Sequence, residues 1–449
     1  MLTDEQQEIK DYFLSFLFNK EKYLIIDGPG GAGKSYLLRE LLNTLLHDYE
    51  DMAKLLGKEI TYFNYALTST THKSCEALSV LQPVSGDLDI RTIHSLLGLV
   101  VYEDYSTGKV SLRPAKSGLT VLSNTILFVD ECSMIDADLF NYIDRLTHNC
   151  KVVFIGDRYQ LAPIKMVESP IYSYGIKEFS LSKIIRTDKE DLLTLNTLLR
   201  DAVKDNICKS IQCSENIIWL DDHDSKTEQW IQDYIVDENK DNHILCYTNK
   251  SVRNYNHAVN VLKNKSSEII EGDEVILNDI AMASPVTNAQ SFKDLGTSFE
   301  LLNTDSFLRI EHINHNIQTY SFNLNGFTYF ISYKNILIYS FAKQKYYKLN
   351  QLLDIPTHND FLKNLKKVKQ WGNYFTIKKY FADIRSTDSL TVHKAQGSTF
   401  NNVLIDLTDL GTCKNPEIFR RLLYVAISRA KNKVFLTGYL PRKYGEIYL

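Results

Sequence analysis

Near its N-terminus the chain carries the segment Gly28-Pro29-Gly30-Gly31-Ala32-Gly33-Lys34-Ser35. The apolar run Tyr23–Ile26 precedes it and the helix-like run Tyr36–Leu42 follows it. Strand, glycine-rich loop and helix in this order are the context that a phosphate-binding loop requires. The glycines let the backbone curl so that successive N–H groups point at phosphates, and the helix N-terminus adds partial positive charge. The sequence therefore predicts a nucleotide-binding loop rather than a plain glycine turn.

Two acidic residues can supply the carboxylates that a phosphate-binding loop needs for a cation and for the attacking water. Asp130 and Glu131 follow the apolar run Ile126–Val129, so they stand at the carboxyl end of a predicted strand, where doubly wound sheets place ligands. In such a site Lys34 reaches the β- and γ-phosphates, and Ser35 and Asp130 hold Mg²⁺. Glu131 would orient and deprotonate the attacking water. Together the two motifs predict hydrolysis of a nucleoside triphosphate.

Three more side chains are candidates for the same site. Gln160 follows the apolar run Lys151–Ile155 and can hydrogen-bond a γ-phosphate or the attacking water. Arg186 follows a strand-and-turn pattern and is a candidate for stabilising transition-state charge, although lone arginines usually lie at the surface. Gln6, in the expected helix over residues 2–18, has an amide that can read an adenine edge. It can equally be a solvated helix residue.

The length, composition and net charge of the chain limit the class of protein. A chain of 449 residues predicts two to four domains, and 44% hydrophobic with 24% charged residues is typical of a globular protein. The net charge of −4 excludes a globally basic nucleic-acid binder, so any such site must be a local groove. The 27 Tyr and 21 Phe supply cores and surfaces for base stacking.

The ends and the cysteines point to a reduced compartment. The acidic start, Met1–Gln7, is not a signal peptide, and we find no apolar run long enough to span a membrane. The seven cysteines are scattered and have no zinc-site spacing. We expect a cytoplasmic protein (in the host cytoplasm if it is viral) that has structural thiols.

Several expected strands end in turns rich in hydroxyl and polar groups. The strand expected over residues 59–67 ends at Thr68–Ser74, and similar turns follow at Arg91–Leu96 and at Thr248-Asn249. Such a turn can bind a nucleic-acid backbone through its hydroxyl and N–H groups. It can equally be a plain helix cap. Residues 99–116 differ, because they predict a small β-hairpin around a glycine-containing turn.

The segment 272–355 loses the helical period and is β-rich. It contains four short runs, and Asn325-Gly326 between two of them is a strong hairpin signal. We expect short strands at 307–310, 319–322, 327–331 and 335–339, which form a small β-barrel. Residues 357–381 then predict one basic amphipathic helical arm, whose lysines can also be a simple solvated face.

At this point the chain resembles superfamily 1 helicases over most of its length, because a whole series of motifs occurs in order. Gly28–Ser35 is motif I and Asp130-Glu131 is motif II. The remaining matches are Gln6 at the Q-motif, Thr70–Ser74 at motif Ia, Thr92–Ser95 at Ib, Gly156–Pro163 at III, Arg186 at IV, Thr391–Gly397 at V and Tyr424–Ala430 at VI. The short chain and the β-rich insertion resemble the 1B branch, which includes Dda-like and RecD-like enzymes.

The resemblance implies an α/β fold with two RecA-like P-loop domains in tandem. Domain 1A would span residues 1–186, with the 99–116 hairpin as its insertion 1B. Domain 2A would span 187–271 and 385–449. Residues 272–384 would be an inserted domain 2B, an SH3-like β-barrel with a helical arm.

The resemblance also implies a site and a track. ATP and Mg²⁺ would lie between the domains, with Lys34, Asp130, Glu131, Gln160, Arg186 and Arg429 as catalytic residues and Gln6, Gly28–Ser35, Gln396 and Gly397 as nucleotide contacts. Single-stranded DNA would be held by Thr71, His72, Thr92, His94, Thr248, Asn249, Thr391 and His393. Tyr102 and Tyr105 are candidates for the aromatic wedge of a strand-separating pin, although either can simply pack the hairpin.

The expected function is therefore an ATP-dependent DNA helicase that moves 5′ to 3′, as the 1B branch does, and unwinds duplexes at single-strand/double-strand junctions. Its partners would include a single-strand-binding protein or proteins of replication, recombination or repair. Three alternatives remain: a single-strand translocase that displaces proteins without separating strands, a P-loop nucleotide or metabolite kinase, and a DNA-binding subunit with a degenerate ATPase. A kinase would not need the second α/β half that ends in Tyr424–Arg429.

Overall fold

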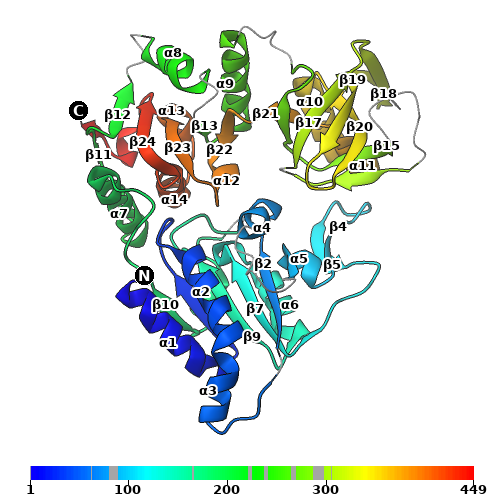
Figure 1. Cartoon of the computed structure of the whole chain (residues 1–449). Helices are drawn as coiled ribbons and strands as arrows, with labels where there is room; N and C mark the ends of the chain where they lie inside the picture. The colour runs from blue at the N-terminus through cyan, green and yellow to red at the C-terminus, as the bar shows by residue number, and fades with distance from the viewer. Residues whose placement is uncertain are drawn as a thin grey trace.

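The computed structural model of this chain describes residues 2–61, 63–79, 89–163, 166–220, 225–236, 241–263, 269–286, 298–304 and 306–448. Its three larger sheets are two parallel sheets and one antiparallel sheet. In Figure 1 the first parallel sheet lies at the bottom, the second at the upper left and the antiparallel sheet at the upper right.

The first sheet is built from the N-terminal part of the chain, and all its pairings are parallel. Neighbouring residues alternate between its two faces: Ile26 and Phe128 pack in one core, Ile25 and Val129 in the other. The strand order is β10 (Lys177–Ser180), β1 (Tyr23–Asp27), β9 (Lys151–Gly156), β7 (Thr125–Asp130), β2 (Asn64–Ser69), β3 (Asp89–Thr92). The helices of this part are α1 (Asp4–Phe18), α2 (Lys34–His47), α3 (Tyr49–Leu55), α4 (His72–Ser79), α5 (Ile93–Leu96) and α6 (Ala137–Leu146), with short 3₁₀ segments at Cys132–Met134 and Pro170–Ser173 and a small pair, β6 (Leu122–Ser123) with β8 (Thr147–His148).

Strand β2 begins and ends later than expected from residues 59–67. The polar residues Thr68 and Ser69 continue the ladder, opposite Val129 and Asp130 of β7. The hydroxyl-rich turn therefore starts at the strand's own carboxyl end.

The second parallel sheet repeats the arrangement. Leu245 and Ile405 pack in one core, and Ile244 and Leu404 pack in the other. Its order is β12 (Ile217–Leu220), β24 (Ala430–Thr437), β23 (Phe400–Asp406), β13 (Asn242–Cys246), β22 (Ser389–Thr391). Its helices are α7 (Glu190–Lys204), α8 (Lys226–Trp230), α9 (Asn249–Leu262), α12 (Val392–Ala395), α13 (Leu407–Gly411) and α14 (Pro416–Ile427), with a π-helical turn at Ile231–Ile235, a 3₁₀ turn at Arg442–Tyr444 and the pair β11 (Ile211–Gln212) with β25 (Ile447–Tyr448).

The antiparallel sheet occupies the β-rich segment. Its strands are β14 (Glu274–Leu277), β15 (Ala281–Val286), β16 (Glu300–Leu302), β17 (Phe307–Ile313), β18 (Gln318–Leu324), β19 (Phe327–Ser340), β20 (Lys345–Leu352) and β21 (Ile384–Ser386). The sheet path runs from β16 to β21, with β18 paired beside it to β19. Closure of this sheet into an SH3-like barrel stays a prediction.

Two local expectations here are wrong. The strands expected at 327–331 and 335–339 are one continuous strand, β19, because the residues between them also pair, Ser332 and Tyr333 with β18 and Tyr333 and Lys334 with β20. The single arm expected over 357–381 is two helices, α10 (Ile355–Lys367) and α11 (Trp371–Tyr380). They are separated at Lys369, whose φ of 58° is left-handed and ends a helix.

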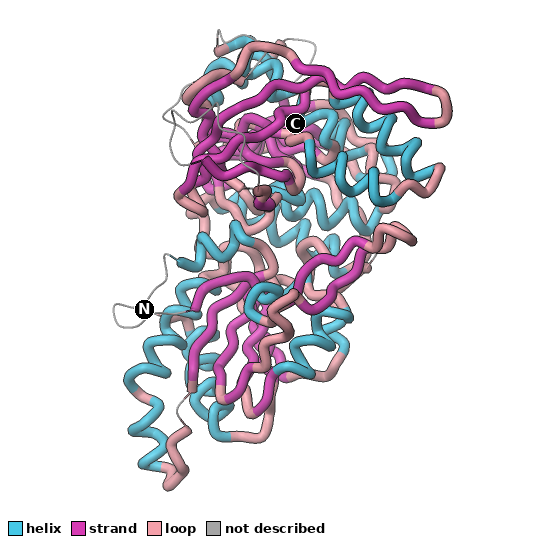
Figure 2. The backbone as a smooth tube through the Cα atoms, turned by 90° about the vertical axis from the view of Figure 1, so that its right-hand side faces the viewer, coloured by secondary structure: helices cyan, strands magenta, loops and turns pink. Residues whose placement is uncertain are grey.

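A small hairpin leaves the first sheet after α5. Its strands β4 (Leu99–Glu103) and β5 (Val110–Pro114) pair antiparallel. Figure 2 shows this hairpin below the strands and helices of the antiparallel part. None of the described helices is both long enough and apolar enough to cross a lipid bilayer.

Candidate active site and nucleic-acid track

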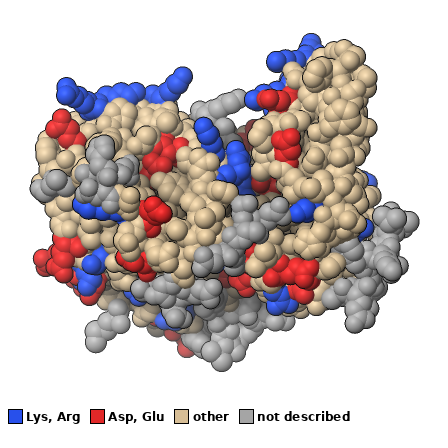
Figure 3. Space-filling view, turned by 90° about the horizontal axis from the view of Figure 1, so that it is seen from above, with Lys and Arg blue, Asp and Glu red and all other residues tan. Residues whose placement is uncertain are grey.

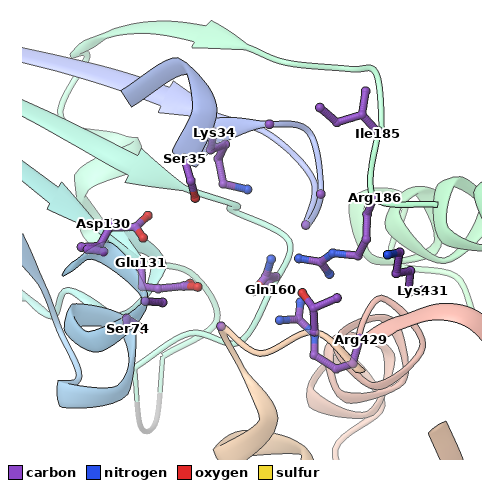
Figure 4. Close-up of a pocket in the computed structure, with 17 residues that line it drawn as sticks. Lys34, Ser35, Ser74, Asp130, Glu131, Gln160, Ile185, Arg186, Arg429 and Lys431 are labelled. Carbon is purple, nitrogen blue, oxygen red and sulfur yellow. The ribbon is translucent and has the colours of Figure 1, made fainter. Parts of the chain in front are cut away.

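A cavity of about 400 Å³ lies between the two parallel sheets. The first sheet lines it with the glycine loop, Lys34, Ser35, Asp130 and Glu131. The linker that follows β10 and the second sheet supply Arg186, Gly397, Thr399, Arg429 and Lys431 (Figure 4). The two halves of the chain thus share one polar cavity.

The glycine loop has the backbone conformation that its sequence predicts. Gly31 and Gly33 have φ of 88° and 77°, which side chains rarely tolerate. Nζ of Lys34 donates to the carbonyl oxygens of Gly28 and Pro29 at 2.7 and 2.9 Å. The ammonium is therefore held at the loop, where a phosphate would meet it.

Gln6 is buried and touches the same loop. Its Nε2 donates to the carbonyl of Ala32 at 3.3 Å, while its Oε1 accepts from the backbone N–H of Thr3. The side chain is thus a reciprocal helix cap that also braces the loop. A role in reading adenine stays a prediction.

The two acids lie at the end of β7, as expected. Glu131 turns the chain with a left-handed φ of 52°. Burial, and next the charge of Glu131, raise the pKa of Asp130 to about 7. A hydroxyl and a carboxylate, Ser35 and Asp130, are oxygen donors of the type that Mg²⁺ takes when phosphates supply the other ligands. The residues present therefore fit this cation.

Two arginines approach the glycine loop, Arg186 from the segment that follows β10 and Arg429 from the second sheet's half. A Cβ added at Gly30 would lie 3.2 Å from both Nη1 of Arg186 and Nη2 of Arg429. Arg186 donates to the carbonyl of Ser428, and Arg429 donates to the carbonyl of Val425 at 3.0 Å. Burial, and next the charge of Arg429, lower the pKa of Arg186 to about 9. Such a pair of crowded cations favours an anion between them.

Polar contacts cross the cavity between the sheets. Gln396 Nε2 donates to Glu131 Oε2 at 3.3 Å. Gly397 has a φ of 80°, and a Cβ there would lie 3.1 Å from Oγ of Ser74. Gln160 is buried, its Nε2 donates to Asp157 Oδ2 at 3.1 Å, and its Oε1 has no hydrogen-bond partner among the described residues.

Sequence reasoning missed four residues of this interface. Arg421 donates to the carbonyls of Arg158 and Gln160, and Tyr424 donates to Asp157. The sequence does carry a signal for Arg421 and Tyr424, because both are polar residues within the largely apolar helix 416–427. Lys431, which lines the cavity, lies two residues after Arg429. Arg200 had no signal, because it is one polar position on an amphipathic helix.

The residues predicted to contact DNA form two groups, one at the carboxyl ends of strands of the first parallel sheet and one at the carboxyl ends of strands of the second. In each group the threonine hydroxyls cap helices: Thr71, Thr92, Thr248 and Thr391 accept from the backbone N–H three residues on, at 3.2 to 3.3 Å. Thr92 and Thr391 are buried, whereas the side chains of Thr71, His72, Asn249 and His393 are exposed. The caps fix four helix starts at the carboxyl ends of β2, β3, β13 and β22. Direct DNA contact by these residues stays a prediction.

The first group lies beside a second cavity of about 510 Å³, whose opposite wall is the antiparallel sheet. His72 Nε2 and the amide nitrogen of Asn303 lie 3.0 Å apart across it. Burial lowers the pKa of the half-buried His94. In the second group Thr248 donates to Asp409 at 2.7 Å and Asn249 accepts from Arg385 at 2.7 Å. Seen from above, positive and negative side chains are interspersed on the described surface (Figure 3), as the small net charge predicts.

The tip of the β4–β5 hairpin lies against α11. Tyr105 stacks on Phe375 with ring centroids 5.6 Å apart, and Glu103 pairs with Lys379. The guanidinium of Arg113 covers the ring of Tyr102 at 3.7 Å. Both tyrosines remain exposed on their other sides. The hairpin is therefore held by the arm rather than projecting alone.

Comparison with known proteins adds family information. The AAA domain family matches residues 1–225, half of the chain, and the UvrD-like helicase C-terminal domain matches residues 388–437. The ATP-dependent DNA helicase Dda of Enterobacteria phage T4 is 23% identical, over 97% of this chain and 98% of Dda. The RecBCD enzyme subunit RecD of Buchnera aphidicola is 24% identical, over 91% of this chain and 68% of RecD.

Among solved structures, Pif1 helicase from Bacteroides, in complex with ADP-AlF3 and single-stranded DNA, has a similar fold. The TM-score is 0.50 at 15% identity, and the match covers 99% of this chain and 94% of Pif1. The two tandem α/β parts expected from the sequence are thus confirmed as a Pif1-like helicase fold. The chain belongs to the AAA-domain family and, through its UvrD-like C-terminal domain, to the superfamily 1 helicases related to Dda and RecD.

Proposed function

We propose that this chain is an ATP-dependent DNA helicase that moves 5′ to 3′ along single-stranded DNA and separates duplexes at a junction. One observation carries the proposal: two arginines reach to within 3.2 Å of the Cβ position of Gly30, across the cavity from the acid pair. The loop and Arg186 come from residues 1–186, whereas Arg429 comes from the second half, so the two halves complete the site together. A triphosphate that meets both sets of groups favours the closed arrangement of the halves.

ATP is the nucleotide, and Ser35 and Asp130 hold Mg²⁺. The cation, when bound, supplies positive charge to the phosphates and removes the repulsion between Asp130 and Glu131. Lys34 leaves its loop carbonyls for the phosphates, and Glu131 takes the proton of the attacking water. Arg186 and Arg429 stabilise the charge that develops on the γ-phosphoryl oxygens. Gln6 and Gln396 with Gly397 complete the nucleotide contacts.

The DNA track runs over the capped helix starts of both sheets. Thr71, His72, Thr92 and His94 hold the strand on the first half, and Thr248, Asn249, Thr391 and His393 hold it on the second. Since backbone phosphates and helix starts carry no sequence information, binding is independent of sequence and weakens with salt. Closing and opening of the nucleotide cleft then changes the spacing of the two grips and moves the chain along the strand.

The domain division follows the resemblance to superfamily 1 helicases. Residues 1–186 form domain 1A, with the 99–116 hairpin as the pin; 187–271 with 385–449 form domain 2A; and 272–384 form domain 2B. Partners are junction DNA and replication, recombination or repair proteins such as a single-strand-binding protein, in the cytoplasm of the cell or of a virus's host.

Tailed duplexes test the proposal directly. We expect unwinding of a partial duplex with a 5′ single-stranded tail, in the presence of ATP and Mg²⁺, and at least about tenfold slower unwinding with a 3′ tail, because a motor with one polarity meets the duplex from only one side. The measurement is strand release from labelled substrates, with a blunt duplex as control. Unwinding of the 3′-tailed substrate alone would overturn the polarity, and ATP hydrolysis that ignores added single strands would overturn the helicase.

Substitution of Gly31 tests the nucleotide site. An added Cβ at Gly31 would overlap the side chain of Arg186, whereas one at Gly175, also at positive φ, would meet open space. Gly31→Ala should weaken ATP binding at least about tenfold, since the loop and Arg186 cannot both keep their positions. Gly175→Ala carries only the backbone strain, about 1–2 kcal/mol of stability, and should keep the ATP affinity. Equal affinities for both variants by nucleotide titration would contradict the site.

The hairpin tyrosines give a separate test of strand separation. Tyr102→Ala and Tyr105→Ala should each keep ATP hydrolysis stimulated by single strands, because neither lies near the nucleotide cleft. At least one of them should slow unwinding by about tenfold or more, since the wedge or its support on Phe375 is lost. Exposed Tyr174, outside the hairpin, gives a matched control in Tyr174→Ala. If both hairpin variants unwind as fast as this control, the pin assignment is wrong.

A further inference from the structure

A second charged cluster lies under the nucleotide cleft, and the mechanism above does not use it. Asp27 is the last residue of β1, directly before Gly28, and Asp157 follows β9. These strands are neighbours, with Asp27 opposite Gly156, so the two carboxylates stand side by side at one sheet edge. Their exposed fractions are 2% and 0%. Burial, and next the charge of Asp157, raise the pKa of Asp27 to about 6.

The hydrogen bonds that the first half gives these acids come from neutral donors, and the charge of Lys34 also acts to lower the pKa of Asp27. Asp27 Oδ1 accepts from the backbone N–H of Arg158 at 2.7 Å and from the hydroxyl of Tyr172 at 3.4 Å. Asp157 Oδ2 accepts from Nε2 of Gln160 at 3.1 Å. Two adjacent buried carboxylates without a cation cannot both stay charged at low cost.

The cation comes from the second half, on helix α7. Nη2 of Arg200 lies 3.0 Å from Asp27 Oδ2, and its Nε lies 3.7 Å from Asp157 Oδ1. The guanidinium also lies over the ring of Tyr159 at 4.7 Å. Among the described residues Arg200 is the one cation within 4 Å of both carboxylates. Tyr424, also from the second half, donates to Asp157 at 2.7 Å.

The charge on Asp157 fixes how Gln160 points. A carboxylate only accepts hydrogen bonds, so it holds the NH₂ end of the Gln160 amide and turns the oxygen end away. That oxygen, Oε1, is buried without a partner among the described residues, in the side chain that lines the nucleotide cavity (Figure 4). The nitrogen end faces the glycine loop, since a Cβ added at Gly30 would lie 3.5 Å from Nε2. One N–H of this amide donates to Asp157, so the other can donate to a γ-phosphoryl oxygen.

We propose that Arg200 is a positioning residue of the ATPase, which pairs with the buried Asp27 and Asp157 from across the domain interface and thereby holds the Gln160 amide with its nitrogen toward the cleft. The inference rests on the proposed function, because it assigns Gln160 to ATP hydrolysis. It adds a link between the helix that follows the interdomain linker and the amide that faces the phosphate-binding loop. The link exists only while the two halves are in contact.

Steady-state kinetics of the full chain tests this role. Arg200→Gln should lower kcat of single-strand-stimulated ATP hydrolysis by about tenfold to a hundredfold, the loss expected when a positioned group moves by about 1 Å. KM for ATP should change less than about threefold, since the phosphate-binding groups are untouched. Arg145→Gln, at an exposed arginine of α6, is the control and should match the wild type. A kcat of Arg200→Gln within about twofold of the wild type overturns the inference.

Two double variants separate positioning from loss of structure. Adding Asp27→Asn to Arg200→Gln removes one buried negative charge with the positive one, and should restore kcat to within about threefold of the wild type. In a Gln160→Ala background, Arg200→Gln should lower kcat by less than about twofold more, because its effect passes through that amide. Thermal denaturation monitors folding of every variant. If Arg200→Gln alone does not fold, the Asp27→Asn double variant decides: an unfolded protein, or one at least tenfold slower, overturns the inference.

The same kinetics distinguish failure of the proposed function from failure of the role of Arg200. A wild-type chain without DNA-stimulated ATP hydrolysis would remove the function itself before any variant is compared. A wild type that hydrolyses ATP, matched by Arg200→Gln, would remove only the role of Arg200.

Discussion

Buried acids of the first half meet cations of the second half across one interface. The first half holds Asp27, Asp130 and Asp157 at the carboxyl ends of its central strands. Arg200 and Arg429 lie in the second half, and Arg186 lies in the segment that follows β10. Burial makes each set costly alone, since a buried charge without a partner loses its hydration. Pairing across the interface offsets this cost.

This constraint explains why the nucleotide site and the domain interface coincide. The glycine loop offers its backbone N–H groups and the ammonium of Lys34 to a bound phosphate. The arginine pair is crowded, and its pKa values are lowered. An anion bound between the two arginines would offset their repulsion. Gln396 on Glu131, and Arg421 on the carbonyls beside Gln160, make the geometry of the cleft depend on the position of the second half.

The antiparallel insertion makes further contacts between the two halves. Its arm holds the β4–β5 hairpin through a ring stack and an ion pair, and its strand end meets α4 through Asn303 and His72. The insertion leaves the second sheet's half but contacts the first half at both places. The insertion thus connects the second half to the hairpin and to the predicted track.

Local sequence was sufficient for much of this. Glycines at positive φ, an acid pair after an apolar strand and an amphipathic helix depend on neighbours in the chain, so Gly28–Ser35, Asp130-Glu131 and the order of α and β elements could be predicted. The break at Lys369 and the fusion of two runs into β19 could not, because they depend on what packs across the sheet. The sequence left two roles open for the four threonines, DNA contact or helix capping, and the structure shows that their hydroxyls cap helices.

The role of Arg200 could not be predicted from the sequence. Only the pairing of β1 with β9 brings Asp27 and Asp157 together, and only the packing of α7 on this sheet edge brings a cation to both carboxylates. The sequence determined which residues form the predicted phosphate-binding loop, because that pattern is local; the tertiary structure alone decided which charges meet across the interface, because residues distant in the chain, such as Asp27 and Arg200, are brought together only by packing.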